Sequence, residues 1–248
     1  MLYQAYVIFS KEFGGYFRSR LAYFLIGAYA FISMFAAFYM GAFFDLNNME
    51  LYSFFYFQGD VFALLVPALT MRLWAEERRS GTMELLLTQP VSYTAVVLGK
   101  FLSAWVFCLL LLLATVPFLL CPAAIYPLDY LNILSSYLAC FFIAGIFCSV
   151  GCCVSAFNKS PVIAYIATLI LSLIISTGNF DFLLSEFGFS GNVMIRMIQS
   201  LNFSKHFQDL SGGQIGWDNI VYYLSMIILP LWLNVITCLL YTSDAADE

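Results

Sequence analysis

Charged side chains are scarce in this sequence, where Asp, Glu, Lys and Arg together make up only 10% of 248 residues. Hydrophobic residues make up 62%. A soluble protein needs a largely polar surface, and average globular chains carry about 25% charged residues. The composition therefore excludes a soluble globular protein and indicates an integral membrane domain.

Patterns for metal binding, disulfides and covalent catalysis are also missing. The sequence has one histidine, His206, and seven cysteines that lie mostly within apolar runs. No second C-x-x-C pair or set of histidine ligands accompanies them, so neither a zinc site nor a disulfide framework is indicated. No Ser/His/Asp or Cys/His arrangement can be built around His206. We therefore expect no cofactor, no metal and no enzymatic activity in this chain.

Long apolar runs dominate what is present. A transmembrane helix needs about 20 mainly apolar residues. Six segments qualify: about 21–43, 53–74, 93–120, 130–156, 161–177 and 219–240. The fifth is short, and we expect its outer end to tilt or break. The sequence thus predicts an all-α, polytopic membrane protein with six transmembrane helices in a single domain, residues 1–237.

The basic residues predict the orientation of these spans. Eight of the ten lysines and arginines lie in the N-terminal segment or in the connections 75–92 and 157–160 and their flanks, on one side of the membrane. By the positive-inside rule this side is the cytoplasm, so we expect both termini to be cytoplasmic. Residues 2–20 mix aromatic and basic side chains, which favours an N-terminal helix lying in the membrane interface. The alternative is an ordinary polar lead-in to the first span.

Two further segments carry a recognisable pattern. In the fourth span, Cys140, Ala144, Cys148, Cys152 and Ala156 recur every four residues. Such a stripe of small residues lets helices approach closely, so we interpret it as a packing face within the chain or across a dimer.

The region of about 40 residues before the last span is too polar to cross the bilayer, and we expect outer interfacial or re-entrant helices there.

The connection between the second and third spans carries the strongest functional pattern. It reads "AEERRSGTMELLLTQP", with Gly81 permitting a turn, Thr82 able to cap a new helix and Glu84 near the start of that helix. Leucines 85–87 add an apolar ridge before Pro90. A short helix of this kind, tied to two spans, suits contact with a soluble partner. An ordinary tight loop is the alternative. We expect Lys100, further along, to extend its amine to the interface.

This pattern closely resembles the coupling segment of type 2 ABC transporter permeases. The positions in register are Glu76, Glu77, Arg78, Gly81, Thr82, Glu84, Leu86, Leu87, Pro90, Gly99 and Lys100. The resemblance covers nearly the whole chain and is greatest to the permease associated with bacterial gliding motility. It implies an inner-membrane exporter in which two permease chains pair, each with a cytoplasmic ATPase. The residues that would couple the ATPase to the permease are Glu76, Glu77, Arg78, Gly81, Thr82, Glu84, Leu86 and Leu87. Independently of the resemblance, we expect no nucleic-acid partner for a chain of this composition, and we expect lipid around the spans.

The string Leu210 to Gln214, "LSGGQ", resembles the signature of ABC ATPases. A nucleotide site also needs a phosphate-binding G-x-x-x-x-G-K-[ST] loop, and Gly99-Lys100 is followed by Phe101 without the earlier glycine. The string also falls on the side opposite the cytoplasm. We interpret it as a chance match, so that ATP hydrolysis is expected on a separate subunit.

Asp60 is an ionisable residue inside the second predicted span, where such groups are costly and often functional. We expect it, with Gln58, to be a candidate for the translocation path. Its distance from Arg72, about 18 Å along a helix, places it in the outer half, where water can also reach it. An ordinary solvated residue is therefore the alternative.

The C-terminal residues 238–248 resemble the translation of a sequencing adapter, and we expect them to be a non-native tail.

Two other functions stay open from the sequence. One is ABC export of a polysaccharide, lipid or drug with no link to motility. The other is a membrane scaffold that transports nothing.

Overall fold

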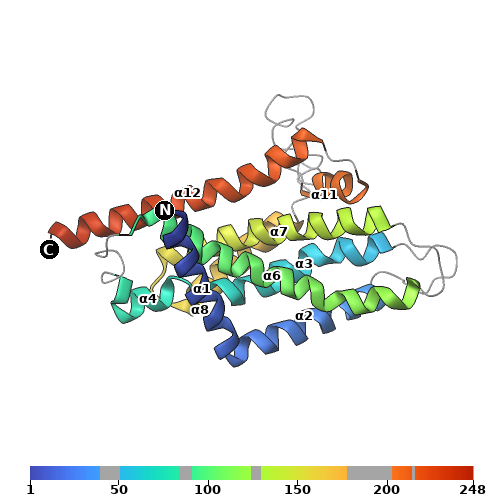
Figure 1. Cartoon of the computed structure of the whole chain (residues 1–248), viewed down its shortest axis with the longest axis horizontal. Coiled ribbons are helices and arrows are strands. Elements are labelled where there is room, and N and C mark those ends of the chain that lie inside the picture. The colour runs from blue at the N-terminus through green and yellow to red at the C-terminus, as the bar shows by residue number, and fades with distance from the viewer. Residues whose placement is uncertain (40–50, 84–90, 124–129, 178–202, 214–215, 248) are drawn as a thin grey trace, which may run out of the picture.

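The computed structural model describes residues 1–39, 51–83, 91–123, 130–177, 203–213 and 216–247 (Figure 1). These residues form helices and no strand, which confirms the all-α prediction for the described part of the chain. The helices are α1 (Leu2–Arg18), α2 (Arg20–Tyr39), α3 (Leu51–Thr70), α4 (Ala75–Ser80), α6 (Tyr93–Ala123), α7 (Tyr130–Phe157), α8 (Pro161–Thr177), α11 (Phe203–Ser211) and α12 (Trp217–Asp247).

Five helical segments are long and apolar enough to cross a membrane. They are Arg20–Tyr39, Phe54–Ser80, Tyr93–Phe118, Tyr130–Phe157 and Trp217–Leu240. Helix α8 coincides with the fifth predicted span, but its 17 residues fall short of the usual spanning length of about 20. The structure therefore has five candidate spans by length and composition, and the six predicted spans, α8 among them, stay a prediction.

Helix α7 lies at the centre of the bundle and contacts α3, α6, α8, α11 and α12. The stripe of small residues predicted as a packing face is completely buried: Cys140, Ala144, Cys148, Cys152 and Ala156 are all 0% exposed. Each of these side chains packs against neighbours in the same chain. The Cys140 thiol, for example, lies 3.9 Å from the Phe55 carbonyl oxygen of α3. The small side chains thus allow several helices to surround α7 closely, as the sequence predicted.

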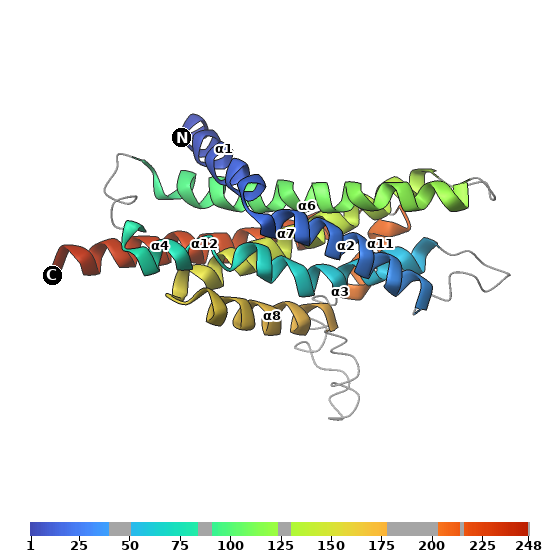
Figure 2. The ribbon, with the colours of Figure 1, turned by 90° about the horizontal axis from the view of Figure 1, so that it is seen from below.

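The two ends of α7 carry different parts of the protein. The carbonyl of Ser211 in α11 accepts a hydrogen bond from Ser135 near the start of α7, whereas α4 contacts Ser155 and Ala156 near its end. Twenty residues of helix separate these contacts by about 30 Å, the thickness of the bilayer hydrocarbon. We refer to these as the α11 end and the α4 end. Both chain termini lie at the α4 end (Figures 1 and 2).

Helix α1 is a separate element that crosses α6 obliquely and does not simply lead into α2 (Figure 2). The crossing is close because Gly99 of α6 has no side chain: a Cβ there would lie 2.9 Å from the Ala5 carbonyl oxygen and 2.9 Å from Ile8. The opposite face of α1 exposes Leu2, Tyr3 and Tyr6. This amphipathic arrangement suits a helix in the membrane interface, which stays a prediction.

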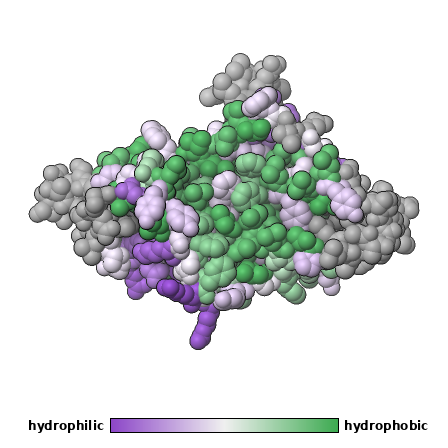
Figure 3. Space-filling view, viewed as in Figure 1, coloured by the Kyte–Doolittle hydropathy of each residue, from purple (hydrophilic) through white to green (hydrophobic). Residues whose placement is uncertain are grey.

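Apolar side chains are exposed over much of the outer surface of the bundle, notably on α2, α8 and α12. Figure 3 shows apolar side chains across one face of the molecule. In the same view, hydrophilic side chains gather toward the α4 end (Figure 3). A wide apolar belt with polar residues at its margin is what a lipid-embedded protein requires. Of the outer segment expected before the last span, residues 178–202 lie outside the described residues, and α11 forms its end.

Candidate functional site

The connection from α3 to α4 is held against α7 by one hydroxyl group. Ser155 Oγ accepts hydrogen bonds from the backbone N–H groups of Trp74 (3.1 Å) and Ala75 (3.2 Å), and it donates to the Met71 carbonyl at 3.0 Å. These N–H groups open α4 and have no partner within the helix, so the serine satisfies donors that would otherwise be buried without a bond. The start of α4 is therefore fixed to the centre of the bundle.

Trp74 anchors the same connection inside the protein. Its side chain is 0% exposed, and its indole Nε1 donates a hydrogen bond to the Cys152 thiol at 3.3 Å. Asn234 of α12 donates to the same sulfur at 3.2 Å. The tryptophan thereby joins the α3–α4 connection to both α7 and the last helix.

The far end of α4 has a second attachment. Arg78 donates from its guanidinium group to the Ala156 carbonyl oxygen of α7 at 2.5 Å. Gly81 then takes a left-handed conformation, with φ of 73°. Left-handed φ values favour glycine, which ends the helix and redirects the chain. Thr82 follows with its hydroxyl 2.8 Å from that of Ser80.

Lys100 of α6 forms a buried charge cluster with acidic residues of two other helices. Its Nζ donates to Glu77 at 2.8 Å, to Glu12 at 3.1 Å and to the Leu73 carbonyl at 2.7 Å. The amine also lies 5.0 Å from the centroid of the Trp74 ring. All three donor positions of the ammonium group are satisfied, so the charge is compensated although it is buried.

The position of Lys100 corrects the expectation from the sequence. We expected this lysine to extend to the membrane interface, but its side chain is only 1% exposed. The expectation was wrong because α1 covers this part of α6 and supplies a carboxylate. The paired acids are more exposed, 23% for Glu12 and 20% for Glu77, so the cluster opens toward the α4 end.

The cluster connects the interfacial helix, the candidate coupling segment and a span. Glu12 belongs to α1, Glu77 to α4 and Lys100 to α6. Helix α4 is also attached to α7. A displacement of α4 would therefore exert force on α1, α6 and α7. The arrangement suits transmission of a movement from one end of the protein into the bundle.

The predicted coupling residues divide into two groups. Glu77 and Arg78 point into the protein as described, whereas Glu76, Gly81 and Thr82 are exposed at the surface of the α4 end. Glu84, Leu86 and Leu87 lie outside the described residues. The described part of the segment therefore has an inner face that binds the bundle and an outer face open to a partner.

The two residues predicted for a translocation path lie on different sides of α3. Gln58 is 1% exposed and accepts hydrogen bonds from Tyr29 (2.5 Å) and Ser33 (3.1 Å) of α2. Asp60 is exposed and accepts a hydrogen bond from Ser176 of α8. The structure therefore places Asp60 beside α8 and Gln58 in the contact between α2 and α3.

The described part of the "LSGGQ" string, Leu210 to Gly213, ends α11 and begins the following turn, and Gln214 lies outside the described residues. Leu210 and Ser211 are buried, and Gly213 has a φ of 78°. This turn lies at the α11 end, about 30 Å from α4. Among the described residues, no group of three or more His, Cys, Asp or Glu side chains could hold a metal ion. The position of the string at a helix end agrees with its interpretation as a structural turn.

Sequence analysis missed the residues that hold the coupling segment in place. Ser155, Trp74 and Glu12 carried no pattern of their own, because each contacts residues 78 to 88 positions away. A signal was available at Glu12 and Lys100, which are charges close to apolar runs and need partners there. Nothing in the sequence identified which partners they find.

Comparison with known protein families identifies one match, which spans residues 6–242 and is described as ABC-2 family transporter protein. The matched range includes every helix described above except the first residues of α1 and the last of α12. No curated protein is significantly similar to the chain in sequence.

Proposed function

Since this chain belongs to the ABC-2 transporter family, we propose that it is the membrane permease subunit of an ATP-driven ABC exporter. It pairs with a second permease chain and with a separate cytoplasmic ABC ATPase that binds and hydrolyses ATP. Substrate crosses the bacterial inner membrane through the permease pair. The chain itself performs no covalent chemistry.

The observation that carries this proposal is the attachment of α4 on its inner face and its exposure on its outer face. The ATPase contacts Glu76, Gly81, Thr82 and the residues that follow, with Glu84, Leu86 and Leu87 in the contact. Glu77 and Arg78 pass the movement on, through Lys100 to α6 and through Ala156 to α7. Closure of the ATPase on ATP thereby moves the spans.

The orientation follows from the basic residues and the shared end of the termini. The α4 end, which holds both termini, faces the cytoplasm. Helix α1 lies in the cytoplasmic interface, and α8 completes six spans together with the five longer helices. Residues 1–237 form this single permease domain, although the family match and α12 continue beyond residue 237.

Asp60 lines the translocation path, with Gln58 supporting the neighbouring helix contact. An exposed carboxylate inside a span requires water, a cation or a polar partner, since lipid alone would leave it unsolvated. The contact with Ser176 puts this carboxylate at the seam between α3 and α8. We place the path along that seam.

Export linked to gliding motility is the most specific form of the proposal, and it rests on the sequence resemblance alone, which covers nearly the whole chain. The two alternatives are export of a polysaccharide, lipid or drug, and a membrane scaffold that transports nothing. A gene for an ABC ATPase beside this one supports a transporter, and a further gliding-type membrane subunit there supports the motility role.

Replacing Gly81 with Ala tests the coupling role. A side chain strains the left-handed backbone by about 1–2 kcal/mol, so we expect ATP turnover of the purified permease–ATPase complex to fall about fivefold or more. The matched control is Gly213→Ala, because Gly213 has a similar φ of 78° but lies at the α11 end. Equal loss in both variants, or no loss in either, would refute coupling through this turn.

A cysteine at position 60 tests the path. In Asp60→Cys, a water-soluble thiol reagent is expected to react about tenfold faster than in Phe31→Cys, because only a hydrated thiol ionises readily. Phe31 is 70% exposed on α2 and faces lipid in the proposed arrangement. The six described native cysteines are buried and give little background. Similar labelling rates at the two positions would remove Asp60 from the path.

A further inference from the structure

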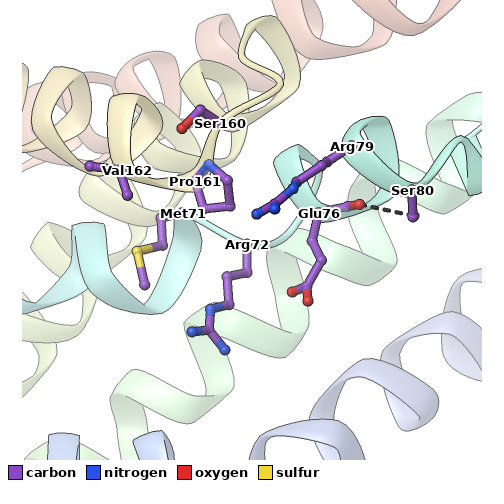
Figure 4. A pocket seen from close by; sticks show the side chains of 8 residues that line it. All are labelled: Met71, Arg72, Glu76, Arg79, Ser80, Ser160, Pro161 and Val162. Carbon is purple, nitrogen blue, oxygen red and sulfur yellow. Dashed lines mark hydrogen bonds between the residues drawn. The ribbon is translucent and has the colours of Figure 1, made fainter.

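The α4 end contains a cavity of about 550 Å³ between the end of α3, α4 and the start of α8 (Figure 4). Its lining residues are Met71, Arg72, Glu76, Arg79, Ser80, Ser160, Pro161 and Val162. Figure 4 shows the Arg79 side chain reaching across toward Pro161, with Arg72 and Glu76 on the other side. The cavity is therefore polar on the α4 side and apolar where it meets α8.

Two arginines in this cavity lack a protein partner among the described residues. Neither Arg72 nor Arg79 forms a hydrogen bond or an ion pair there, in contrast to the neighbouring Arg78, which binds the Ala156 carbonyl. One acid, Glu76, lines the same cavity, so the described lining keeps a net positive charge. Guanidinium groups bind phosphate through paired hydrogen bonds, and the hydroxyls of Ser80 and Ser160 are further donors.

The apolar wall continues out of the cavity along α8. Val162 is 65% exposed, Ile163 57% and Ile166 49%, and these residues follow directly from Pro161 in the lining. A soluble anion would gain nothing from this surface. A molecule with a phosphate at one end and hydrocarbon at the other would bind both parts.

We propose that this cavity binds the phosphate headgroup of an anionic phospholipid of the cytoplasmic leaflet. Arg72 and Arg79 hold the phosphate, and the acyl chains lie against Val162, Ile163 and Ile166. A basic site at the cytoplasmic ends of helices is suited to such headgroups. The leaflet rests on the orientation proposed above. Because α4 forms one wall, the lipid would also bridge the coupling segment and α8.

Lipid binding to the purified full-length chain tests the proposal without the ATPase. Phosphatidylglycerol is titrated onto delipidated protein in detergent, and bound lipid is counted by native mass spectrometry. In Arg72→Gln/Arg79→Gln, the Kd of the tightest phosphatidylglycerol site is expected to rise about 30-fold, from the loss of two headgroup contacts. The control Arg18→Gln/Arg20→Gln removes the same charge from exposed positions at the same end, and its Kd should change less than about twofold.

Other outcomes would overturn the proposal. Equal Kd values in both double variants, or equally tight binding of phosphatidylcholine by the unaltered protein, would show no anionic headgroup site. Displacement of the lipid by millimolar inorganic phosphate would identify a site for a free anion instead. Should the double variant fold poorly, Val162→Asp keeps the test open: a carboxylate on the apolar wall should weaken phosphatidylglycerol binding, and unchanged binding would contradict it. Because these affinities are measured in detergent, they do not depend on which side of the membrane the α4 end faces. The test of the lipid site is therefore separate from the proposed orientation.

Discussion

The variant Lys100→Met is expected to lower the free energy of unfolding by about 3 kcal/mol or more. The substitution keeps the volume of the side chain but removes the charge that Glu12 and Glu77 share and the donor to the Leu73 carbonyl. Two partly buried carboxylates then face each other without compensation. Denaturant unfolding of the purified chain in mixed micelles measures the loss. Because the cluster also connects α4 to α6, the variant should also uncouple ATP turnover by the ATPase from movement of the spans.

Two comparisons separate this effect from a general loss of positive charge. Lys159→Met removes an exposed lysine at the same end and should leave the stability within about 0.5 kcal/mol. The triple variant Lys100→Met/Glu12→Gln/Glu77→Gln removes all three charges and should recover most of the lost stability. A stable single variant, or a triple variant as unstable as the single one, would contradict the charge cluster.

The variant Gly151→Ala is expected to cost about 2–3 kcal/mol through overpacking of α7 against α3. A Cβ at position 151 would lie 2.1 Å from Thr70 Oγ1 and 2.8 Å from Thr70 Cβ, and Thr70 is completely buried. Both contacts are shorter than real Cβ atoms tolerate, so Thr70 or the two helices must shift. The same unfolding experiment measures the effect.

The contact itself provides the control for this prediction. Thr70→Gly removes both colliding atoms. The double variant Gly151→Ala/Thr70→Gly should therefore lose less unfolding free energy than the two single variants lose together. In Gly27→Ala, where a Cβ would meet nothing within 4 Å, the substitution within α2 should be neutral or stabilising. Destabilisation at Gly27 equal to that at Gly151, or strict additivity of Gly151 and Thr70, would argue against this packing.

Helix positions in the described chain could be predicted because they depend on local pattern. The run 161–177 gave the bounds of α8, and the i, i+4 stripe from Cys140 to Ala156 gave the buried face of α7. Both signals are periodic within one segment, and burial follows from that periodicity. The sequence could not decide whether the stripe packs within the chain or across a dimer, because that depends on other helices.

The candidate site was predicted only in part, for the same physical reason. Gly81 could be predicted because a turn after a charged helix favours glycine, and its φ of 73° confirms a left-handed turn. The burial of Lys100 could not, because its partner Glu12 is 88 residues away and comes from a helix expected in the interface. Contacts of this kind depend on how the helices cross, which no local pattern specifies.

The most direct test of the coupling proposal is a photo-crosslinking amino acid at Thr82, which is exposed beside the Gly81 turn. In cells that make both subunits, the account predicts a crosslinked product that contains the ABC ATPase. The same amino acid at Trp217, which is 82% exposed at the α11 end, should give no such product. Absence of the ATPase from the Thr82 product, or equal crosslinking from both positions, would contradict a cytoplasmic ATPase docked on the α4 segment.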